Sequence, residues 1–218
     1  MPNRTRCSRR SRSPRSPGTT WSAALALALV AAPIAGCAAQ QVDVRQLQLP
    51  APAAASATKS ALPLHIVLDP ARVPASIEAT GGDVKPVTVD GLHAFVERDL
   101  RNALSSVFTS VDVVPPNQSY PDQYYLLAEV EITQLRFMST GGGSQTAGRL
   151  EWTFRLRAAG RDQHIYQTTG TTGPAVGKGD VEAAIAGVLE AAVDKVMTAY
   201  VERDIVGRVA RLEQSLPR

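Results

Sequence analysis

The sequence predicts an α+β domain, a two-layer sandwich in which two helices cover one face of a mostly antiparallel sheet of about four or five strands. Two segments, 90–108 and 181–202, repeat apolar residues at three- and four-residue steps, which is the pattern of amphipathic helices. Two others, 124–136 and 149–158, alternate apolar and polar residues, which is the pattern of strands with one buried face. One apolar sheet face and two apolar helix stripes can bury one another in two layers.

The first predicted element is a buried strand over residues 64–68, a mainly apolar run that ends at Asp69-Pro70. Residues 70–87 then contain three prolines and Gly81-Gly82. Because these residues interrupt regular structure, the sequence predicts a loop there, without a long helix or strand.

The first helix is predicted over 90–108, with Asp90 at its start. An aspartate carboxylate at that position can accept the free amide protons of the first helical turn. A short strand is predicted over 111–114, because Pro115-Pro116 follows directly and cannot continue a hydrogen-bonded ladder.

The two alternating segments form the centre of the predicted sheet. Glu129 and Glu131 share the polar face of the first, and arginines of the second are expected opposite them as ion-pair partners. The glycine-rich residues 139–148 are predicted as a long, flexible connection between the two strands. A third strand over 163–171 has Ile165-Tyr166 as its only bulky apolar residues, so it is expected at a sheet edge.

The C-terminal part is predicted as a loop, a helix and a tail. Residues 170–179 are glycine-rich, and Asp180 can cap the helix that follows over 181–202. The apolar pattern continues more weakly over 203–218, with Gly207 as a bend, so this segment is predicted as an exposed amphipathic tail.

The N-terminus has the composition of an export signal. Residues 1–20 carry six arginines and no acidic residue, and the uncharged run 21–32 follows and ends at Pro33. Its length is within the about 7–15 residues of a signal-peptide apolar region and short of the about 20 that span a bilayer. Two alternatives stay open: an uncleaved membrane anchor that extends to Ala39, and a twin-arginine signal at Arg9-Arg10.

The next four residues, Ile34-Ala35-Gly36-Cys37, resemble the lipobox of bacterial lipoproteins. The resemblance implies cleavage between Gly36 and Cys37, a diacylglycerol on the Cys37 sulfur and usually an acyl chain on its amine. Two or three acyl chains anchor a protein stably where one is marginal. Ala38 stands where inner-membrane lipoproteins usually have Asp, so the resemblance also implies the periplasmic face of the outer membrane of a Gram-negative bacterium. That sorting rule varies between lineages.

Cleavage leaves 182 residues, which suffice for one domain and a tether. Residues 37–60, rich in Ala, Gln and Pro, are predicted as the lipidated cysteine and a flexible tether, with an edge strand in 42–49 as the alternative. Residues 61–202 are predicted as the α+β domain. The segment 203–218 is the tail.

The predicted mature chain is mildly acidic and free of thiols. Removing the six signal arginines leaves 17 basic against 20 acidic residues, so no nucleic-acid partner is expected. Cys7 leaves with the signal and Cys37 carries lipid, so no thiol remains for a disulfide, a metal or a nucleophile.

No catalytic, cofactor or metal site is predicted. The segment 170–179 lies between a strand and a helix as a phosphate loop does, but Thr172 and Gly179 stand where that motif needs Gly and Ser or Thr. Tyrosines and prolines gather within 115–125 and form either a binding rim or a cluster packed on its own loops. The three histidines occupy different elements without a ligand spacing: His65, His93 and His164.

The layout of lipobox, tether, paired strands and closing helix resembles three groups of envelope lipoproteins. These are auxiliary lipoproteins of ABC-type lipid transport, YajG-like lipoproteins and the lipoprotein partner of the lipopolysaccharide-assembly barrel. The resemblance implies a non-enzymatic accessory or binding component in envelope transport or assembly, with a protein partner and a membrane anchor. The expected docking surface is the sheet edge at 163–171 or the segment 203–216.

Two further hypotheses stay open. One is a direct carrier of lipid or another small ligand, held between helices and sheet. The other is an envelope hydrolase, which is disfavoured because no nucleophile and base pair can be named. The oligomeric state is not predicted.

Overall fold

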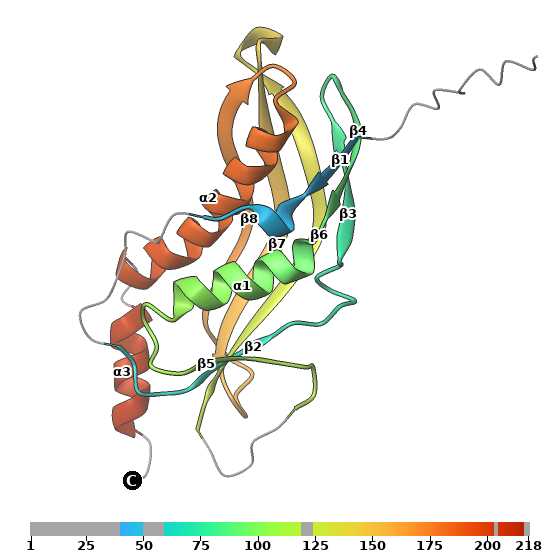
Figure 1. Ribbon diagram of the computed structural model, residues 1–218. Helices are drawn as coiled ribbons and strands as arrows, with labels where there is room; N and C mark the ends of the chain where they lie inside the picture. Colours follow the sequence, from blue (N-terminus) through green and yellow to red (C-terminus); the bar gives the residue numbers. More distant parts are fainter. Residues whose placement is uncertain (1–39, 50–58, 119–123, 203–204, 216–218) are drawn as a thin grey trace, which may run out of the picture. The chain divides into compact units, whose positions relative to one another are not determined.

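Eight strands in one sheet and three helices make up the fold of the residues that the structure describes. The computed structural model describes residues 40–49, 59–118, 124–202 and 205–215. In chain order (Figure 1) the elements are β1 (Gln40–Asp43), η1 (Val44–Gln46), β2 (Leu64–Val67), β3 (Ser76–Gly81), β4 (Val84–Asp90), α1 (Leu92–Leu104), β5 (Val111–Val114), β6 (Leu126–Thr140), η2 (Gly141–Gly143), β7 (Gln145–Ala158), β8 (His164–Gly177), α2 (Val181–Glu202) and α3 (Ile205–Ser215).

The α+β class predicted from the sequence is confirmed, but the sheet is larger and more mixed than expected. It has eight strands instead of about four or five. Of the seven described strand pairs, four are parallel: β1–β4, β2–β5, β2–β6 and β3–β6. Most paired residues nevertheless lie in antiparallel ladders, as expected, because β6–β7 and β7–β8 are long. Parallel pairs join segments that are distant in sequence, so local alternation does not reveal them.

Strand β6 organises the sheet. On one side it pairs with β7 along its length, and β8 follows β7. On the other side, β2 pairs with its first residues, Leu126 to Glu129, and β3 pairs with Leu135 and Arg136 near its end. Two smaller groups of strands, β2–β5 and β3–β4–β1, therefore branch from different levels of β6.

The apolar alternation of β6 continues through an irregularity. The pairing of β6 with β7 shifts register between Ile132 and Gln134. One extra residue in a strand restores the direction of the following side chains, which explains how Leu135 and Phe137 stay buried although they break the earlier two-residue count. As predicted, the first half of the strand buries one set of side chains: Leu126, Ala128, Val130 and Ile132.

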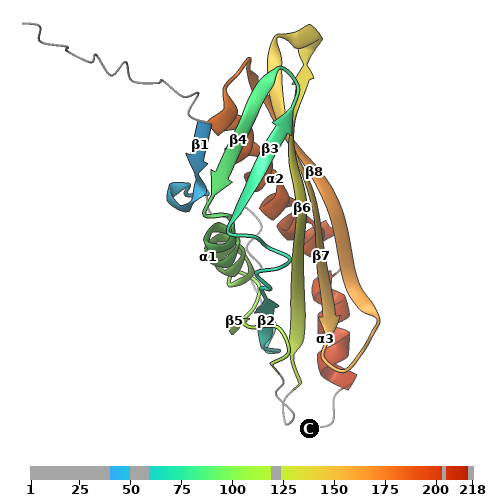
Figure 2. The ribbon, with the colours of Figure 1, turned by 90° about the vertical axis from the view of Figure 1, so that its right-hand side faces the viewer.

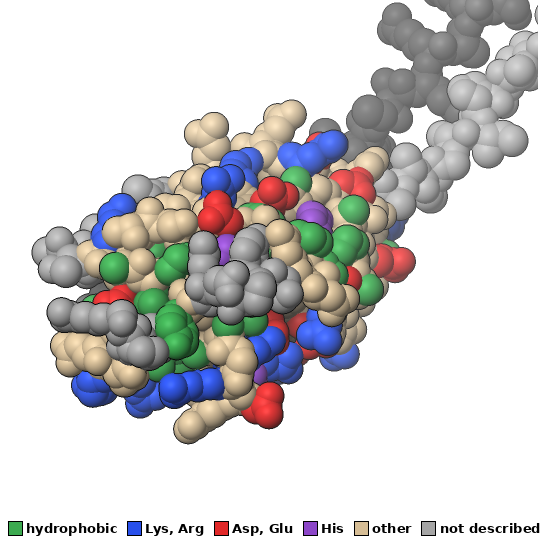
Figure 3. Space-filling view, turned by 90° about the horizontal axis from the view of Figure 1, so that it is seen from below, with side chains coloured by type: hydrophobic (Ala, Val, Ile, Leu, Met, Phe, Trp, Pro, Cys, Tyr) green, Lys and Arg blue, Asp and Glu red, His purple; other side chains and the backbone are tan. Residues whose placement is uncertain are grey.

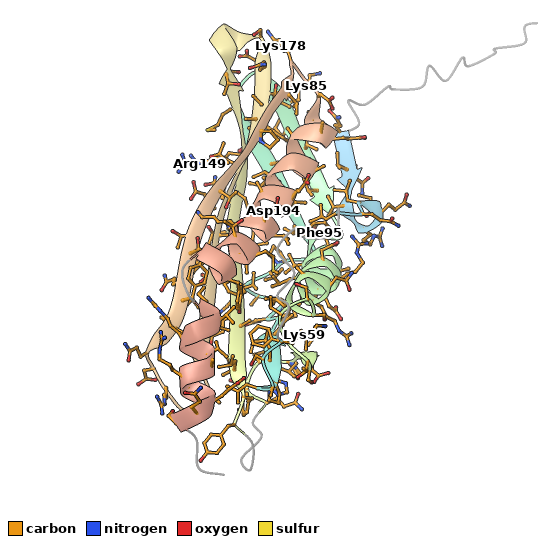
Figure 4. All side chains as sticks on the ribbon, turned by 90° about the vertical axis from the view of Figure 1, so that its left-hand side faces the viewer. Lys59, Lys85, Phe95, Arg149, Lys178 and Asp194 are labelled. Atoms are coloured by element: carbon orange, nitrogen blue, oxygen red, sulfur yellow. The ribbon has the colours of Figure 1, made fainter. Side chains whose placement is uncertain are left out.

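The helices cover one face of this sheet. In Figure 1, α1 and α2 both lie in front of the strands, and in Figure 2 α2 and α3 lie behind β6, β7 and β8. Phe95 of α1 points into the space between α1 and α2 (Figure 4) and is 1% exposed. Buried side chains of the sheet and of all three helices belong to one hydrophobic cluster.

Helix α2 lies directly on β7 and β8 because glycines on those strands allow a close approach. A Cβ atom added at Gly148 would lie 2.5 Å from the carbonyl oxygen of Ala184. One added at Gly173 would lie 2.6 Å from the backbone nitrogen of Val188. Side chains at these two positions are therefore excluded by the backbone of the helix.

The two predicted helix caps differ in outcome. The Oδ1 atom of Asp180 accepts a hydrogen bond from the backbone N–H of Ala183 at 3.2 Å, so the predicted cap of α2 is confirmed. The predicted cap of α1 is wrong, because Asp90 is the last residue of β4 and Gly91, at φ 79°, precedes the helix without a side-chain cap. The Asp90 carboxylate instead accepts a hydrogen bond from the side chain of Gln41 in β1.

Three segments predicted as loops are largely strands. The segment 70–87 contains β3 and part of β4, paired as a hairpin. The segment 139–148 holds the ends of β6 and β7, so that Gly141–Ser144 alone connect them, and the segment 170–179 holds the second half of β8. Glycine and proline are depleted in strands, and here pairing with neighbouring strands outweighs that preference.

The folded region also extends beyond both predicted limits. The predicted tether over 37–60 is wrong for residues 40–46, where β1 pairs with β4 at the sheet edge, η1 follows, and Val42 and Val44 are buried. The alternative, an edge strand in 42–49, is correct in type, but the strand spans Gln40–Asp43. The tail forms α3, whose Ile205 and Val209 join the core. Among the described residues, no helix is long and apolar enough to cross a membrane.

Candidate functional site

The predicted lipidation site, Cys37, and the signal over residues 1–36 lie outside the described residues. Inside the described residues lie the predicted docking surfaces, and also the histidines and the two glutamates, for which no catalytic or metal role is predicted.

The structure keeps the three histidines apart. His65 is buried on β2 and packs edge-on against the ring of Tyr125, with ring centroids 4.9 Å apart. The Nδ1 atom of His93 on α1 lies 2.9 Å from the carbonyl oxygen of Val73, and His164 is exposed at the start of β8. In the described part of the chain, no group of three or more His, Cys, Asp or Glu side chains is arranged to hold a metal ion.

Burial of His65 makes a prediction about pH. Desolvation lowers the pKa of its imidazole below the ordinary value, against a weaker opposing effect of Asp112. The imidazole therefore binds a proton more tightly in the unfolded chain than in the folded one. The contribution of His65 to the free energy of unfolding is fully present above a pH of about 6.5 and is lost as the pH falls below that value. Denaturation with urea at pH 7.5 and 5.5 should show this loss for the wild type and a smaller loss for His65→Leu. An equal loss in both proteins would assign the pH dependence to other groups.

Glu129 and Glu131 form the predicted cross-strand ion pairs. The Oε1 atom of Glu129 lies 2.9 Å from Nη2 of Arg157, and the Oε2 atom of Glu131 lies 3.6 Å from Nη1 of Arg155. All four side chains are partly exposed, so each pair contributes at most about 1 kcal/mol. Both carboxylates are therefore held by arginines of β7, and Glu129 and Arg157 also line a space of about 330 Å³ together with Asp69 and Arg72.

The two described tyrosines of the predicted tyrosine and proline cluster differ in burial. Tyr125 is buried against His65, whereas Tyr124 is 54% exposed. Tyr120 and Pro121 lie outside the described residues.

The two predicted docking surfaces meet in a single groove. The start of β8 and the outer face of α3 enclose a space of about 350 Å³ at one end of the domain. We call this space the basic groove, and its lining residues are Ala158, Arg161, Gln163, His164, Ile165, Arg208, Arg211, Leu212 and Ser215. The sheet edge at 163–171 and the segment 203–216 were predicted as alternative docking surfaces, and residues of both line the same groove.

Cationic side chains dominate this groove. Three arginines and His164 line it, and none of its described lining residues is acidic; Asp162 is exposed beside it but is not part of the lining. Figure 3 looks onto this end of the domain and shows Lys and Arg side chains along one border. Among the ion pairs of the described residues, none involves Arg161 or Arg208. The groove therefore concentrates positive charge on a chain whose predicted mature form is slightly acidic.

The open edge of β8 is closed to further strand pairing at several points. Nη1 of Arg208 donates to the carbonyl oxygen of Ile165 at 3.1 Å. Nζ of Lys195 donates to the carbonyl oxygens of Thr169 and Gly170 at 2.9 and 2.6 Å. Lysine and arginine on an edge strand are a known protection against edge-to-edge association. The carbonyl oxygens of Ile165, Thr169 and Gly170 are therefore already occupied by side chains of the helices.

A smaller recess lies beneath α3. Its volume is about 90 Å³, and it is lined mainly by apolar groups of α3, Val107, Phe108 and Tyr200. The hydroxyl of Tyr200 is buried with no hydrogen-bond partner among the described residues, and burial raises its pKa. A cavity of about 150 Å³ holds a benzene molecule, so the recess is too small for an acyl chain of a membrane lipid.

Comparisons with known proteins give no family. No family model matches the chain, and no curated protein matches it with significance. Solved structures with a similar arrangement include a DUF330 protein from Xanthomonas campestris, with 13% identity, a TM-score of 0.48 and coverage of 81% of this chain and 100% of that one.

Two further solved structures are more distant. One is an uncharacterized protein with 15% identity, a TM-score of 0.40 and coverage of 77% and 99% of the two chains. The other is a putative neuraminyllactose-binding hemagglutinin homolog from Helicobacter pylori, with 12% identity, a TM-score of 0.35 and coverage of 78% and 100%. Scores this low support no transfer of function, so the chain's own residues carry the proposal below.

Proposed function

We propose that this protein is a non-enzymatic lipoprotein, anchored by Cys37 to the periplasmic face of the outer membrane, that acts as an accessory component in envelope transport or assembly. Its basic groove is the binding surface for a partner. The observation that carries the proposal is the combination of the lipobox-like Ile34-Ala35-Gly36-Cys37 with a groove between β8 and α3 whose charged side chains, among the described residues, are all cationic.

The described residues support binding more than catalysis. The histidines lie on different elements, Glu129 and Glu131 are held in ion pairs with arginines, and the groove gathers arginines without a carboxylate among its described lining residues. General acid–base or nucleophilic chemistry needs a nucleophile and a base within hydrogen-bond reach. Arginines remain charged at physiological pH and suit recognition of anionic groups instead.

Site-specific photo-crosslinking in cells tests this function. A photo-reactive amino acid at Gln163, which is exposed in the groove, should give a discrete adduct with an envelope protein. The matched position is Lys85, which is exposed and lies far from α3 in Figure 4. Adducts of equal yield from both positions, or none from Gln163, would contradict the assignment of the groove.

A second candidate function is the carriage of a small apolar ligand in the recess beneath α3. The buried Tyr200 hydroxyl favours it, because a ligand with one hydrogen-bond acceptor would satisfy that group. The volume of about 90 Å³ argues against a diacyl lipid. Native mass spectrometry should show no co-purified phospholipid in the domain. A stoichiometric lipid adduct other than the anchor would favour a lipid carrier over the partner-binding function.

A further inference from the structure

We infer that the basic groove faces away from the anchoring membrane and binds an acidic segment of a protein partner, instead of the anionic headgroups of that membrane. The inference rests on the proposed anchor at Cys37. Three observations lead to it: the short distance from the anchor to β1, the position of the groove relative to β1, and the chemistry of the groove.

The fold begins almost at the anchor. Gln40, the first residue of β1, is three residues after Cys37, and three extended residues span at most about 11 Å. Strand β1 is held by its ladder with β4, from Gln40↔Val87 to Asp43↔Asp90. The N-terminal end of β1 therefore lies within about 11 Å of the proposed anchor, so this end of the domain stays close to the bilayer.

The groove and this end of β1 lie on opposite edges of the sheet. Along the path β1–β4–β3–β6–β7–β8, the two edge strands are five strand spacings apart, or about 24 Å in a flat sheet. Strand β8 begins at His164, and its first residues line the groove together with α3. In Figure 1, β1 and α3 correspondingly lie far apart.

They also lie at different levels along the strands. Gln40 is aligned through Val87 and Ala79 with Leu135 of β6. His164 is aligned through Arg157 with Leu127 of β6. The eight residues between these two levels correspond to about 26 Å along the strand.

The direction of β1 adds to this separation. It runs parallel to β4, β4 runs antiparallel to β3, and β3 runs parallel to β6. Strand β1 is therefore antiparallel to β6, and its N-terminal end points away from the level of His164. A membrane attached at that end meets the domain on the side remote from the groove.

The chemistry of the groove selects an acidic protein segment with an apolar side chain. Arg161, Arg208 and Arg211 supply planar donors that match carboxylates. Ile165 and Leu212, partly buried at the same place, supply an apolar base. A volume of about 350 Å³ is at the lower end of ligand pockets and fits a few side chains of a partner.

Peptide binding by the full lipidated protein in phosphatidylethanolamine vesicles tests the occupant. The probe is a fluorescent peptide of Glu-Glu-Leu repeats, and a Lys-Lys-Leu peptide is its control. The charge-reversed variant Arg161→Glu/Arg211→Glu should bind the acidic peptide about tenfold more weakly or worse, and added salt should weaken wild-type binding. The matched variant Arg136→Glu, an exposed arginine of β6 outside the groove, should bind within about twofold of the wild type. Equal binding of both peptides, or equal loss in both variants, would overturn the inference.

Quenching of a label tests the orientation. The predicted mature chain has no free thiol, so Gln163→Cys and Lys85→Cys can each carry one fluorophore. In vesicles with phosphatidylglycerol and nitroxide-labelled headgroups, the label at Lys85 should be quenched more than that at Gln163. Stronger quenching at Gln163 would show headgroups in the groove and overturn the inference. A protein that does not float with the vesicles would instead refute the anchor, and with it the proposed function.

Discussion

Replacing Cys37 with alanine is expected to abolish lipid labelling of this protein. The substitution removes the sulfur that carries the diacylglycerol in the proposed lipoprotein. Each buried CH₂ of an acyl chain contributes about 0.8 kcal/mol to membrane binding, so loss of the chains removes on the order of 10 kcal/mol per chain. Cells fed radioactive palmitate should show a labelled wild-type band and no labelled Cys37→Ala band.

The matched control is the other cysteine of the chain. Cys7 lies before the apolar run, and Cys7→Ala should leave palmitate labelling and membrane flotation unchanged. Palmitate on the Cys37→Ala protein, or loss of label in Cys7→Ala, would refute Cys37 as the lipidated residue.

The substitution Gly173→Val is expected to lower the free energy of unfolding by about 2–3 kcal/mol. A Cβ atom at this position would lie within 2.8 Å of three backbone atoms of α2, at Gly187 and Val188. Backbone atoms of a packed helix cannot rotate away as a flexible side chain can, so α2 must shift from the sheet.

Gly177 provides the matched control, because it lies on the same strand and an added Cβ there has no atom within 4 Å. Gly177→Val should therefore leave stability within about 0.5 kcal/mol of the wild type. Urea denaturation followed by circular dichroism compares the two variants. Equal destabilisation would show that the cause is the loss of glycine in β8 and not the contact with α2.

The sequence predicted the elements whose apolar pattern is local. Helices α1 and α2 and strands β6 and β7 each repeat apolar residues at the period of their own structure. Asp180 could also be recognised, since a helix cap depends on residues a few positions away. These elements form the two layers of the predicted sandwich.

The elements that were missed depend on distant partners. Strand β1, which the sequence offered only as an alternative edge strand in 42–49, buries Val42 alone, and its pairing with β4 joins residues more than forty positions apart. The second half of β8 is rich in glycine and threonine, and Gly173 is required there by the backbone of α2. A single sequence shows such a glycine as a loop signal, because the helix that demands it is folded onto the strand from elsewhere.

The candidate site could be predicted in parts but not as a whole. The edge position of β8 and the amphipathic character of α3 both followed from their apolar residues. The spacing of Arg208 and Arg211, three residues apart on α3, places them on one side of a helix. Their meeting with Arg161 and His164 is a tertiary contact that no local pattern encodes.

The central claim, that this is a lipid-anchored protein, is tested most directly by the mass of its mature N-terminal peptide. The protein is purified from membranes, digested and measured by mass spectrometry. We predict a peptide that begins at Cys37 and carries the added mass of a diacylglycerol, with or without a further acyl chain on the amine. An unmodified Cys37 in a peptide that continues back into Ile34-Ala35-Gly36 would contradict the account.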